Sequence, residues 1–354
     1  MSGTSRWKAL AAVAIVAVAV VAYFALRGGE RTQQASGGKL VWRYSVWGPP
    51  RAFTRGAEKA KEMWEAAGKG RFELQVHYAG ALAPEKEHLD SIKIGLIEAA
   101  HVCVGYHPAK LPLAQVLELP FLLTADMRIN ARVIDAVMRH PLVEEELASR
   151  WNAKYVMVAA LGPYEFMGNR QLTKVEDLKG ARMRISGANA TVLEKFGAVP
   201  TMVTAPETYT ALERGTIDMV GFPWTDSFGV FRLHEVSKYA TVGISMSGFA
   251  CFFAVSQDAW NRMPDDLKAM LEDVREQATL ETFKAYDEGD QKWLPIFSQR
   301  LEITQFPPSE RAKMVAAAAP LWDEWAAEQD QQGQKGTEIL DFAKEQVAKF
   351  SAYR

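Results

Sequence analysis

The sequence has few of the residues that usually build a catalytic or metal centre. It has only two cysteines, and its six histidines are scattered without the i, i+4 spacing of a metal-binding helix. We find no Gly-x-Ser-x-Gly elbow, phosphate-binding loop, dinucleotide fingerprint or solenoid-length repeat. These absences argue against the commonest nucleotide-dependent and zinc enzymes. We therefore expect no cofactor, no metal and no enzymatic activity.

The two cysteines, Cys103 and Cys251, both lie in apolar segments that resemble strands. In an exported protein such a pair can form a disulfide. The alternative is two separate buried thiols that act as small hydrophobic side chains. The apolar surroundings favour the separate thiols.

Neither sign of charge dominates the sequence. Lysine and arginine total 41 against 43 acidic residues, for a formal net charge of −2, and the two signs are interspersed. No basic run lies beside aromatic residues, so nucleic acid is not an expected partner. Apolar residues make up 48% of the 354 residues, which is enough for substantial cores and suits two lobes.

The N-terminus carries the one long hydrophobic run. Arg6 and Lys8 precede an uncharged run of 18 residues at 9–26. Signal-peptide cores are usually ~7–15 residues, whereas a spanning helix needs ~18 or more. A cleavage-like site at 17–19 would leave apolar residues on the mature protein, so we favour a membrane anchor slightly over a cleaved signal peptide. Both alternatives export the rest of the chain, after a polar tether that ends at residue 38.

Alternating and helical patterns predict the order of the elements. Strands are expected at 40–46, 72–78 and 98–104, with helices at 53–67 and 85–94 between them. This order implies parallel strands joined by right-handed crossovers. Later helices are expected at 128–149, from about 265 to 292, and over most of 309–350. We expect a kink or restart at Pro320 and interruptions at Gly333 and Gly336.

The most informative stretch spans residues 169–224. It contains Lys179-Gly180, a short alternating strand with Arg184, a glycine at 197, and Ala-Leu-Glu-Arg-Gly-Thr-Ile-Asp at 211–218. The order and spacing of these motifs resemble the substrate-binding subunit of tripartite ATP-independent periplasmic (TRAP) transporters, in the C4-dicarboxylate-binding-like family. The resemblance covers about residues 40–345.

The resemblance implies an α/β fold with two lobes of the periplasmic-binding-protein type, with interlobe crossovers and long C-terminal helices. The expected divisions are a signal peptide or membrane anchor plus tether at 1–38, lobe I at 39–162, lobe II at 163–247, a return strand and lobe-spanning helix at 248–292, and C-terminal helices at 293–354.

Arg184 is the main candidate site residue. The family places its carboxylate-binding arginine on the fourth residue after the Lys-Gly glycine, and counting from Gly180 gives Arg184. The alternative is an exposed strand arginine paired with an acid, and we expect that role for Arg182. Some relatives carry a second arginine where this chain has Tyr164, so the resemblance does not imply a two-arginine grip.

Several other residues are candidates for the same ligand site. Trp47 and Tyr106 follow predicted strands, and ligands of α/β sheets bind at the carboxyl ends of strands. Phe222 and Trp224 come from a Phe-Pro-Trp turn. These aromatics can instead be core residues. The remaining candidates are Tyr164, as a hydroxyl donor, and Glu165, which can alternatively form a hinge salt bridge.

The resemblance implies an extracytoplasmic solute-binding protein, active as a monomer. It would capture an organic acid with an apolar or aromatic body and deliver it to an ion-gradient-driven TRAP permease. The alternatives are a ligand sensor and a membrane-tethered periplasmic enzyme, in which Glu165 and His107 would be the acid–base candidates. The sequence does not name the ligand, and it leaves open whether a metal bridges the ligand.

Overall fold

The computed structural model describes residues 38–185, 188–246 and 250–352. The chain divides into Met1–Lys39 and Leu40–Arg354, and every element described below lies in the second unit. The hydrophobic run at 9–26 lies outside the described residues. Within the described residues, no helix is both long enough and apolar enough to cross a membrane.

The first sheet contains five strands in the order β2-β1-β3-β10-β4. The strands are β1 Leu40–Ser45, β2 Phe72–His77, β3 Ala99–Cys103, β4 Ala153–Ala159 and β10 Cys251–Ser256. Strand β1 pairs in parallel with β2 and β3, connected through α2 Arg55–Gly68 and α3 His88–Lys93, as the β-α-β pattern predicts. Strand β10 returns late in the chain and pairs antiparallel with β3 and β4.

The second sheet contains six strands in the order β11-β9-β5-β8-β6-β7. The strands are β5 Tyr164–Gly168, β6 Arg182–Arg184, β7 Val199–Pro200, β8 Met219–Pro223, β9 Tyr239–Val242 and β11 Glu302–Gln305. Parallel strands β6 and β8 lie side by side, with Arg184 opposite Val220. Gly180 and Gly215 take positive φ angles of 72° and 66° in the turns before these strands, which explains the two motif glycines.

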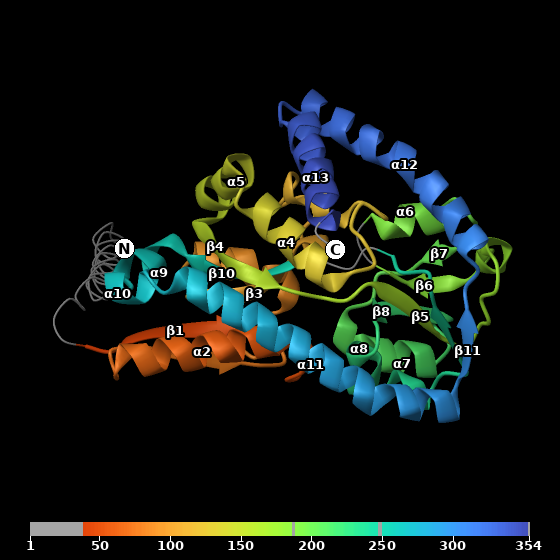
Figure 1. Cartoon of the computed structure of the whole chain (residues 1–354), viewed down its shortest axis with the longest axis horizontal. Helices are drawn as coiled ribbons and strands as arrows, with labels where there is room; N and C mark the ends of the chain where they lie inside the picture. Colours follow the sequence, from red (N-terminus) through yellow and green to blue (C-terminus); the bar gives the residue numbers. More distant parts are fainter. Residues whose placement is uncertain (1–37, 186–187, 247–249, 353–354) are drawn as a thin grey trace, which may run out of the picture. The chain divides into compact units, whose positions relative to one another are not determined.

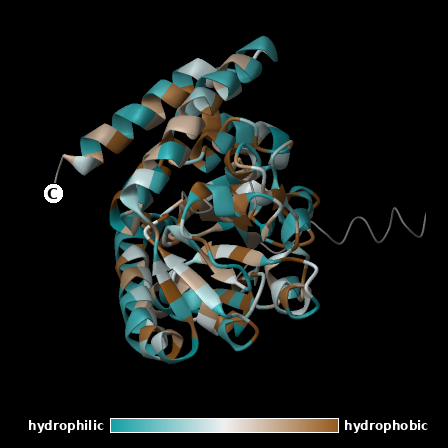
Figure 2. Cartoon of the chain, turned by 90° about the vertical axis from the view of Figure 1, so that its right-hand side faces the viewer, coloured by the Kyte–Doolittle hydropathy of each residue, from teal (hydrophilic) through white to brown (hydrophobic). Residues whose placement is uncertain are grey.

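Helices cover the two sheets and connect them (Figure 1). Besides α2 and α3, the helices are α4 Met127–Met138, α5 Pro141–Trp151, α6 Asn189–Glu194, α7 Thr208–Glu213, α8 Asp226–Val230, α9 Gln257–Arg262, α10 Asp265–Lys268, α11 Leu271–Arg300, α12 Pro308–Gln331 and α13 Gly336–Ser351. Helix α11 contacts α2, beside the first sheet, and α8, beside the second. Hydrophobic residues gather in the interior, and hydrophilic residues cover much of the outer helices (Figure 2).

Two predicted helices differ from the structure. The helix expected at 128–149 is divided into α4 and α5, because Pro141 lacks the N–H of a helix interior and begins a new helix. In contrast, α12 continues through Pro320, where we expected a kink or restart. The expected interruption near Gly333 is confirmed, since α12 ends at Gln331 and α13 begins at Gly336.

Cys103 and Cys251 form a disulfide, so the favoured prediction of two separate thiols is wrong. The two residues are 148 positions apart in sequence, but they lie directly opposite each other on antiparallel strands β3 and β10. Their Cα atoms are 4.0 Å apart, and both residues are buried. The register that brings them together depends on the late return of β10, which local sequence context does not show.

Candidate functional site

Arg184 is fully buried at the end of strand β6. Its Nε donates to the Val203 carbonyl oxygen at 2.9 Å, and its Nη1 donates to the Gly221 carbonyl oxygen at 3.1 Å. Its Nη2 donates to the Tyr106 hydroxyl at 3.3 Å. No carboxylate of the described residues lies within ion-pair distance of the guanidinium. Its neighbours therefore fix the orientation of a buried positive charge without neutralising it.

Arg182 lies two residues earlier on the same strand and has the opposite environment. Its side chain is 45% exposed and pairs with Asp218 at 2.5 Å. Strand alternation puts both arginines on one face of the sheet. Arg184 is buried because residues distant in sequence cover it. Such residues leave no signal in the local sequence pattern around the strand.

Phe222 lies against Arg184. The Arg184 Cζ atom is 4.5 Å from the Phe222 ring centroid, in a cation–π contact. Phe222 in turn stacks on Phe231, with centroids 5.4 Å apart and an interplanar angle of 24°. Phe222 of strand β8 and Phe231 at the end of helix α8 Asp226–Val230 therefore form one aromatic face beside the guanidinium.

Trp47 and Tyr106 reach the same place from the first sheet. Trp47 follows strand β1, and Tyr106 ends the short helix η4 Val104–Tyr106 after β3. Their rings meet edge to face, with centroids 5.9 Å apart, and both side chains are buried. Burial raises the pKa of Tyr106, so its hydroxyl stays neutral and can share hydrogen bonds with Arg184. The structure thus brings Arg184, Phe222, Trp47 and Tyr106 together.

Arg51 is a buried residue beside this group that the sequence analysis did not single out. Its Nη1 donates to the carbonyl oxygens of Trp47 at 3.1 Å and Pro49 at 2.7 Å. Its Cζ lies 4.3 Å from the Trp47 ring centroid and 4.7 Å from that of Phe53. Burial lowers the pKa of Arg51 to about 10. One sequence feature could have pointed to Arg51: it lies just after the Trp-Gly-Pro-Pro turn, at the carboxyl end of a strand.

Tyr164 and Glu165 begin strand β5, and both are buried. The backbone N–H of Tyr164 donates to the Met246 carbonyl oxygen at 3.0 Å. Glu165 accepts from the backbone N–H groups of Gly243 at 2.9 Å and Ser245 at 3.0 Å. Burial raises the pKa of Glu165 to about 7. These contacts direct Glu165 to the loop after β9, where it fixes the backbone.

Trp224 packs on a different set of residues. Its ring lies 5.8 Å from Phe228 and 5.5 Å from Phe297 of α11, centroid to centroid. It also borders a cavity of about 430 Å³ that Gly162 and Tyr286 help to line. Trp224 therefore lies at this cavity, with its ring turned to α11.

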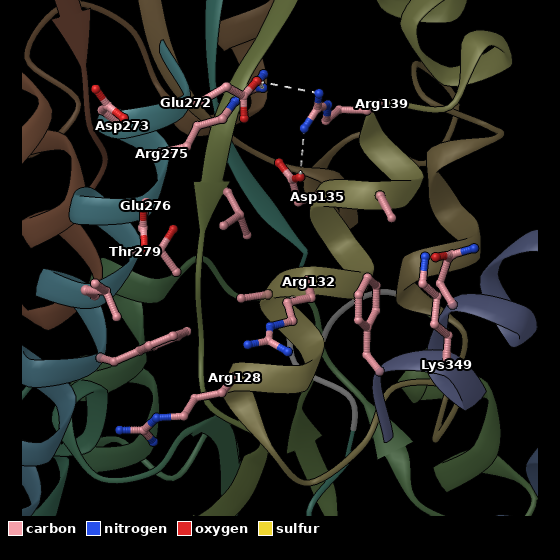
Figure 3. Close-up of a pocket in the computed structure, with 17 residues that line it drawn as sticks. Arg128, Arg132, Asp135, Arg139, Glu272, Asp273, Arg275, Glu276, Thr279 and Lys349 are labelled. Atoms are coloured by element: carbon pink, nitrogen blue, oxygen red, sulfur yellow. Dashed lines mark hydrogen bonds and ion pairs between the residues drawn. The ribbon is translucent and has the colours of Figure 1, made fainter. Parts of the chain in front are cut away.

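A second cavity of about 750 Å³ lies between α4, α11 and α13, away from the predicted site residues (Figure 3). Arg139 pairs there with Asp135 and Glu272, each at 3.5 Å, and Arg275 also pairs with Glu272 at 2.6 Å. These ion pairs compensate the charges of Arg139 and Arg275 at close range. It lacks the buried, unneutralised charge found at Arg184, so we do not assign the site here.

The sequence matches a family of known proteins over most of its length. Residues 45–329 match the family described as bacterial extracellular solute-binding protein, family 7. A monocarboxylate 2-oxoacid-binding periplasmic protein from a Nostoc species is 25% identical, over 83% of this chain and 85% of its own. A C4-dicarboxylate-binding periplasmic protein from Rhodobacter capsulatus is 26% identical, over 81% and 86%.

Two solved structures have the same fold. A TRAP solute-binding protein from Rhodoferax ferrireducens, in complex with copurified benzoate, superposes with a TM-score of 0.77 at 20% identity, covering 89% of this chain and 99% of that one. A marine metagenome TRAP solute-binding protein in complex with 3-hydroxybenzoate gives the same TM-score, identity and coverage. These likenesses confirm the predicted two-lobed α/β fold with long C-terminal helices.

Proposed function

Because this chain belongs to the bacterial extracellular solute-binding proteins of family 7, we propose that it captures an organic acid outside the cytoplasm and delivers it to a TRAP permease. The proposal rests on Arg184, a fully buried guanidinium that the described residues supply with neutral acceptors only. An uncompensated buried charge is costly, so a bound carboxylate would relieve a real electrostatic penalty.

The carboxylate is held by Arg184. A guanidinium has five N–H donors in a planar fork that matches a carboxylate. Three hydrogen bonds to Val203, Gly221 and Tyr106 orient the fork before a ligand arrives. A ligand then does not have to order the side chain, and that preorganisation favours affinity.

The body of the ligand is apolar or aromatic. Phe222 and Tyr106 contact the guanidinium, and Trp47 packs against Tyr106. These ring surfaces suit an apolar ligand more than a hydroxylated sugar. The structural neighbours that hold benzoate and 3-hydroxybenzoate support this choice. Tyr164 and Trp224 complete the proposed site at its edges, while Glu165 contributes by shaping the adjoining loop.

Binding couples to closure of the two lobes, which we divide at 39–162 and 163–247. Arg184 belongs to the second sheet and Tyr106 to the first, so their hydrogen bond spans both. A ligand between them stabilises the closed state by its higher affinity for that state. No turnover is proposed, and the protein acts as a monomer.

We propose that residues 9–26 tether the protein to the periplasmic face of the inner membrane. The support is the 18-residue uncharged run preceded by Arg6 and Lys8. Fractionation of cells that express the full chain tests this proposal. Recovery in a carbonate-washed membrane fraction supports the tether, whereas recovery of a shortened protein in the periplasmic extract contradicts it.

A thermal-shift panel tests the proposed function. Each carboxylic acid is paired with its neutral amide, for example benzoate with benzamide. A ligand that binds only the folded state raises the midpoint by mass action. We expect acids with apolar bodies to raise the midpoint and their amides to leave it unchanged. Equal responses to the acid and amide of each pair would contradict carboxylate capture.

A further inference from the structure

Arg51 carries a hydrogen-bond donor with no acceptor. Its side chain is 6% exposed, and Nη1 is occupied by the Trp47 and Pro49 carbonyl oxygens. The other terminal nitrogen, Nη2, is buried and has no hydrogen-bond partner among the described residues. A buried guanidinium N–H without an acceptor is costly. The fold therefore leaves a strong donor available at this point.

Two neighbouring hydrogen-bond donors also lack an acceptor. The Trp47 Nε1 and Tyr286 Oη atoms are also buried without a hydrogen-bond partner in the described part of the chain. Arg51 stacks on the Trp47 ring and lies within electrostatic reach of Tyr286. Three donors, two from the segment that follows β1 and one from α11, therefore lack an acceptor in one neighbourhood.

Asp226 interacts electrostatically with Arg51, but it does not form an ion pair with it. Its Oδ2 accepts from the Ala52 backbone N–H at 3.2 Å, and no Arg51–Asp226 pair lies within 4.0 Å. Burial raises the pKa of Asp226 to about 6. The contact supplies Asp226 with a partner and leaves Arg51 Nη2 without one.

Arg51 and Arg184 lie at the two ends of one aromatic surface. Arg184 Cζ is 4.5 Å from the Phe222 centroid, and Arg51 Cζ is 5.7 Å from the Phe231 centroid. The two phenyl rings stack on each other, so each cation lies against one ring of the same stacked pair. A flat apolar body lying along the rings would thus have a guanidinium at each end.

We propose that Arg51 binds a second oxygen-bearing group of the ligand, with Trp47 Nε1 and Tyr286 Oη as accessory donors. This inference rests on the proposed capture of an acid by Arg184. The preferred ligand is then a dicarboxylate with an apolar or aromatic body. A second arginine was not expected from the sequence, because the position considered for it holds Tyr164.

Calorimetric titration of the purified protein with matched acids tests this assignment. The probes are benzoate against phthalate, isophthalate and terephthalate, and hexanoate against adipate. The readout is the ratio of dissociation constants within each set. We expect the wild type to bind at least one dicarboxylate about tenfold or more tightly than its monocarboxylate, which corresponds to ~1.4 kcal/mol.

Variants separate recognition from structure. Arg51→Gln should reduce the dicarboxylate preference to about one while benzoate affinity changes little, and Arg51→Lys should retain part of the preference. Tyr286→Phe removes a hydroxyl that holds no other group, so it should lower the preference without disturbing the fold. Arg55→Gln is the matched control, because Arg55 is 47% exposed and pairs with Glu58.

Four results would overturn the proposal. A wild type that prefers monocarboxylates contradicts it directly. If Arg51→Gln and Tyr286→Phe each weaken monocarboxylate and dicarboxylate binding by the same factor, these residues have a structural role only. A wild type that binds none of the acids overturns the proposed function as well, whereas retained monocarboxylate binding with no dicarboxylate preference overturns the Arg51 assignment alone.

Discussion

The Arg184 guanidinium donates to the Tyr106 hydroxyl at 3.3 Å, and this bond joins the end of a strand in the second sheet to a short helix that follows a strand in the first. Both groups are buried. The residue proposed to hold the carboxylate is therefore also a direct polar link between the two sheets. The proposed ligand recognition and the contact between the sheets therefore involve the same guanidinium.

Arg184→Ala should abolish most acid binding. Removing one partner of a desolvated ion pair costs ~3–5 kcal/mol, which corresponds to a hundredfold to several-thousandfold weaker affinity. Arg182→Ala is the control, since it removes an exposed arginine from the same strand. Titration calorimetry on both variants checks the prediction. A loss of less than about tenfold in Arg184→Ala would rule out its role as the carboxylate anchor.

Tyr106→Phe should weaken acid binding by about tenfold or more. The lost hydroxyl bonds to a charged group, and such hydrogen bonds are worth about 1.5–3 kcal/mol. Tyr44→Phe offers a control on strand β1, because the Tyr44 hydroxyl is buried with no partner among the described residues. The control should bind normally and unfold at the same or a higher denaturant concentration. Similar affinity losses in both variants would place the effect in the fold.

Replacing Cys103 and Cys251 together by serine should reduce the free energy of unfolding by about 2–5 kcal/mol, because the cross-link restricts the unfolded chain. Urea unfolding with and without dithiothreitol measures this loss. Reductant should destabilise the wild type and leave the double variant unchanged. A wild-type curve insensitive to complete reduction, verified by thiol titration, would show that the disulfide adds no stability.

Glu118 should make the fold less stable as pH rises from about 6.5 to 8. Its carboxyl is fully buried, and burial raises its pKa to about 8. Between its unfolded pKa of about 4.3 and this value, the folded state binds more protons than the unfolded state, so stability falls as pH rises. The expected loss from this group over that window is about 1–2 kcal/mol.

Denaturant unfolding at pH 6.5, 7.2 and 8 checks this slope. Glu146 and Glu165, with pKa values raised to about 7 by burial, add to it. The buried His88, whose pKa is lowered to about 4, acts below pH 6.5 with the opposite sign. Glu118→Gln should flatten the slope, and exposed Glu144→Gln should not. An unchanged slope in Glu118→Gln would contradict the prediction.

Local patterns predicted much of the fold. Alternation located β1, β2, β3 and the short strand β6 that ends at Arg184, and the resemblance to TRAP substrate-binding subunits singled out Arg184. Periodicity could not separate Arg182 from Arg184, because both lie on one face of a strand and differ only in what covers them. That cover comes from Tyr106, which lies 78 residues earlier.

The features that the sequence did not predict depend on partners far along the chain. Glu165 is held by the loop at Gly243 and Ser245, so its contacts could not be inferred from its neighbours in sequence. The disulfide required the register of β10 against β3. Arg51 is of interest because its Nη2 has no acceptor among the described residues. This depends on the packing of side chains, which the sequence does not show.

The bond between Cys103 and Cys251 also has a topological consequence. It closes a covalent ring over the intervening chain, and this ring contains β5, β6, β7, β8 and β9 of the second sheet. A protease that cuts once inside the ring leaves both fragments attached to each other. A chain pulled by its two ends would extend only through the segments outside the ring. Strands β6 and β8, which carry Arg184 and Phe222, would be shielded from tension.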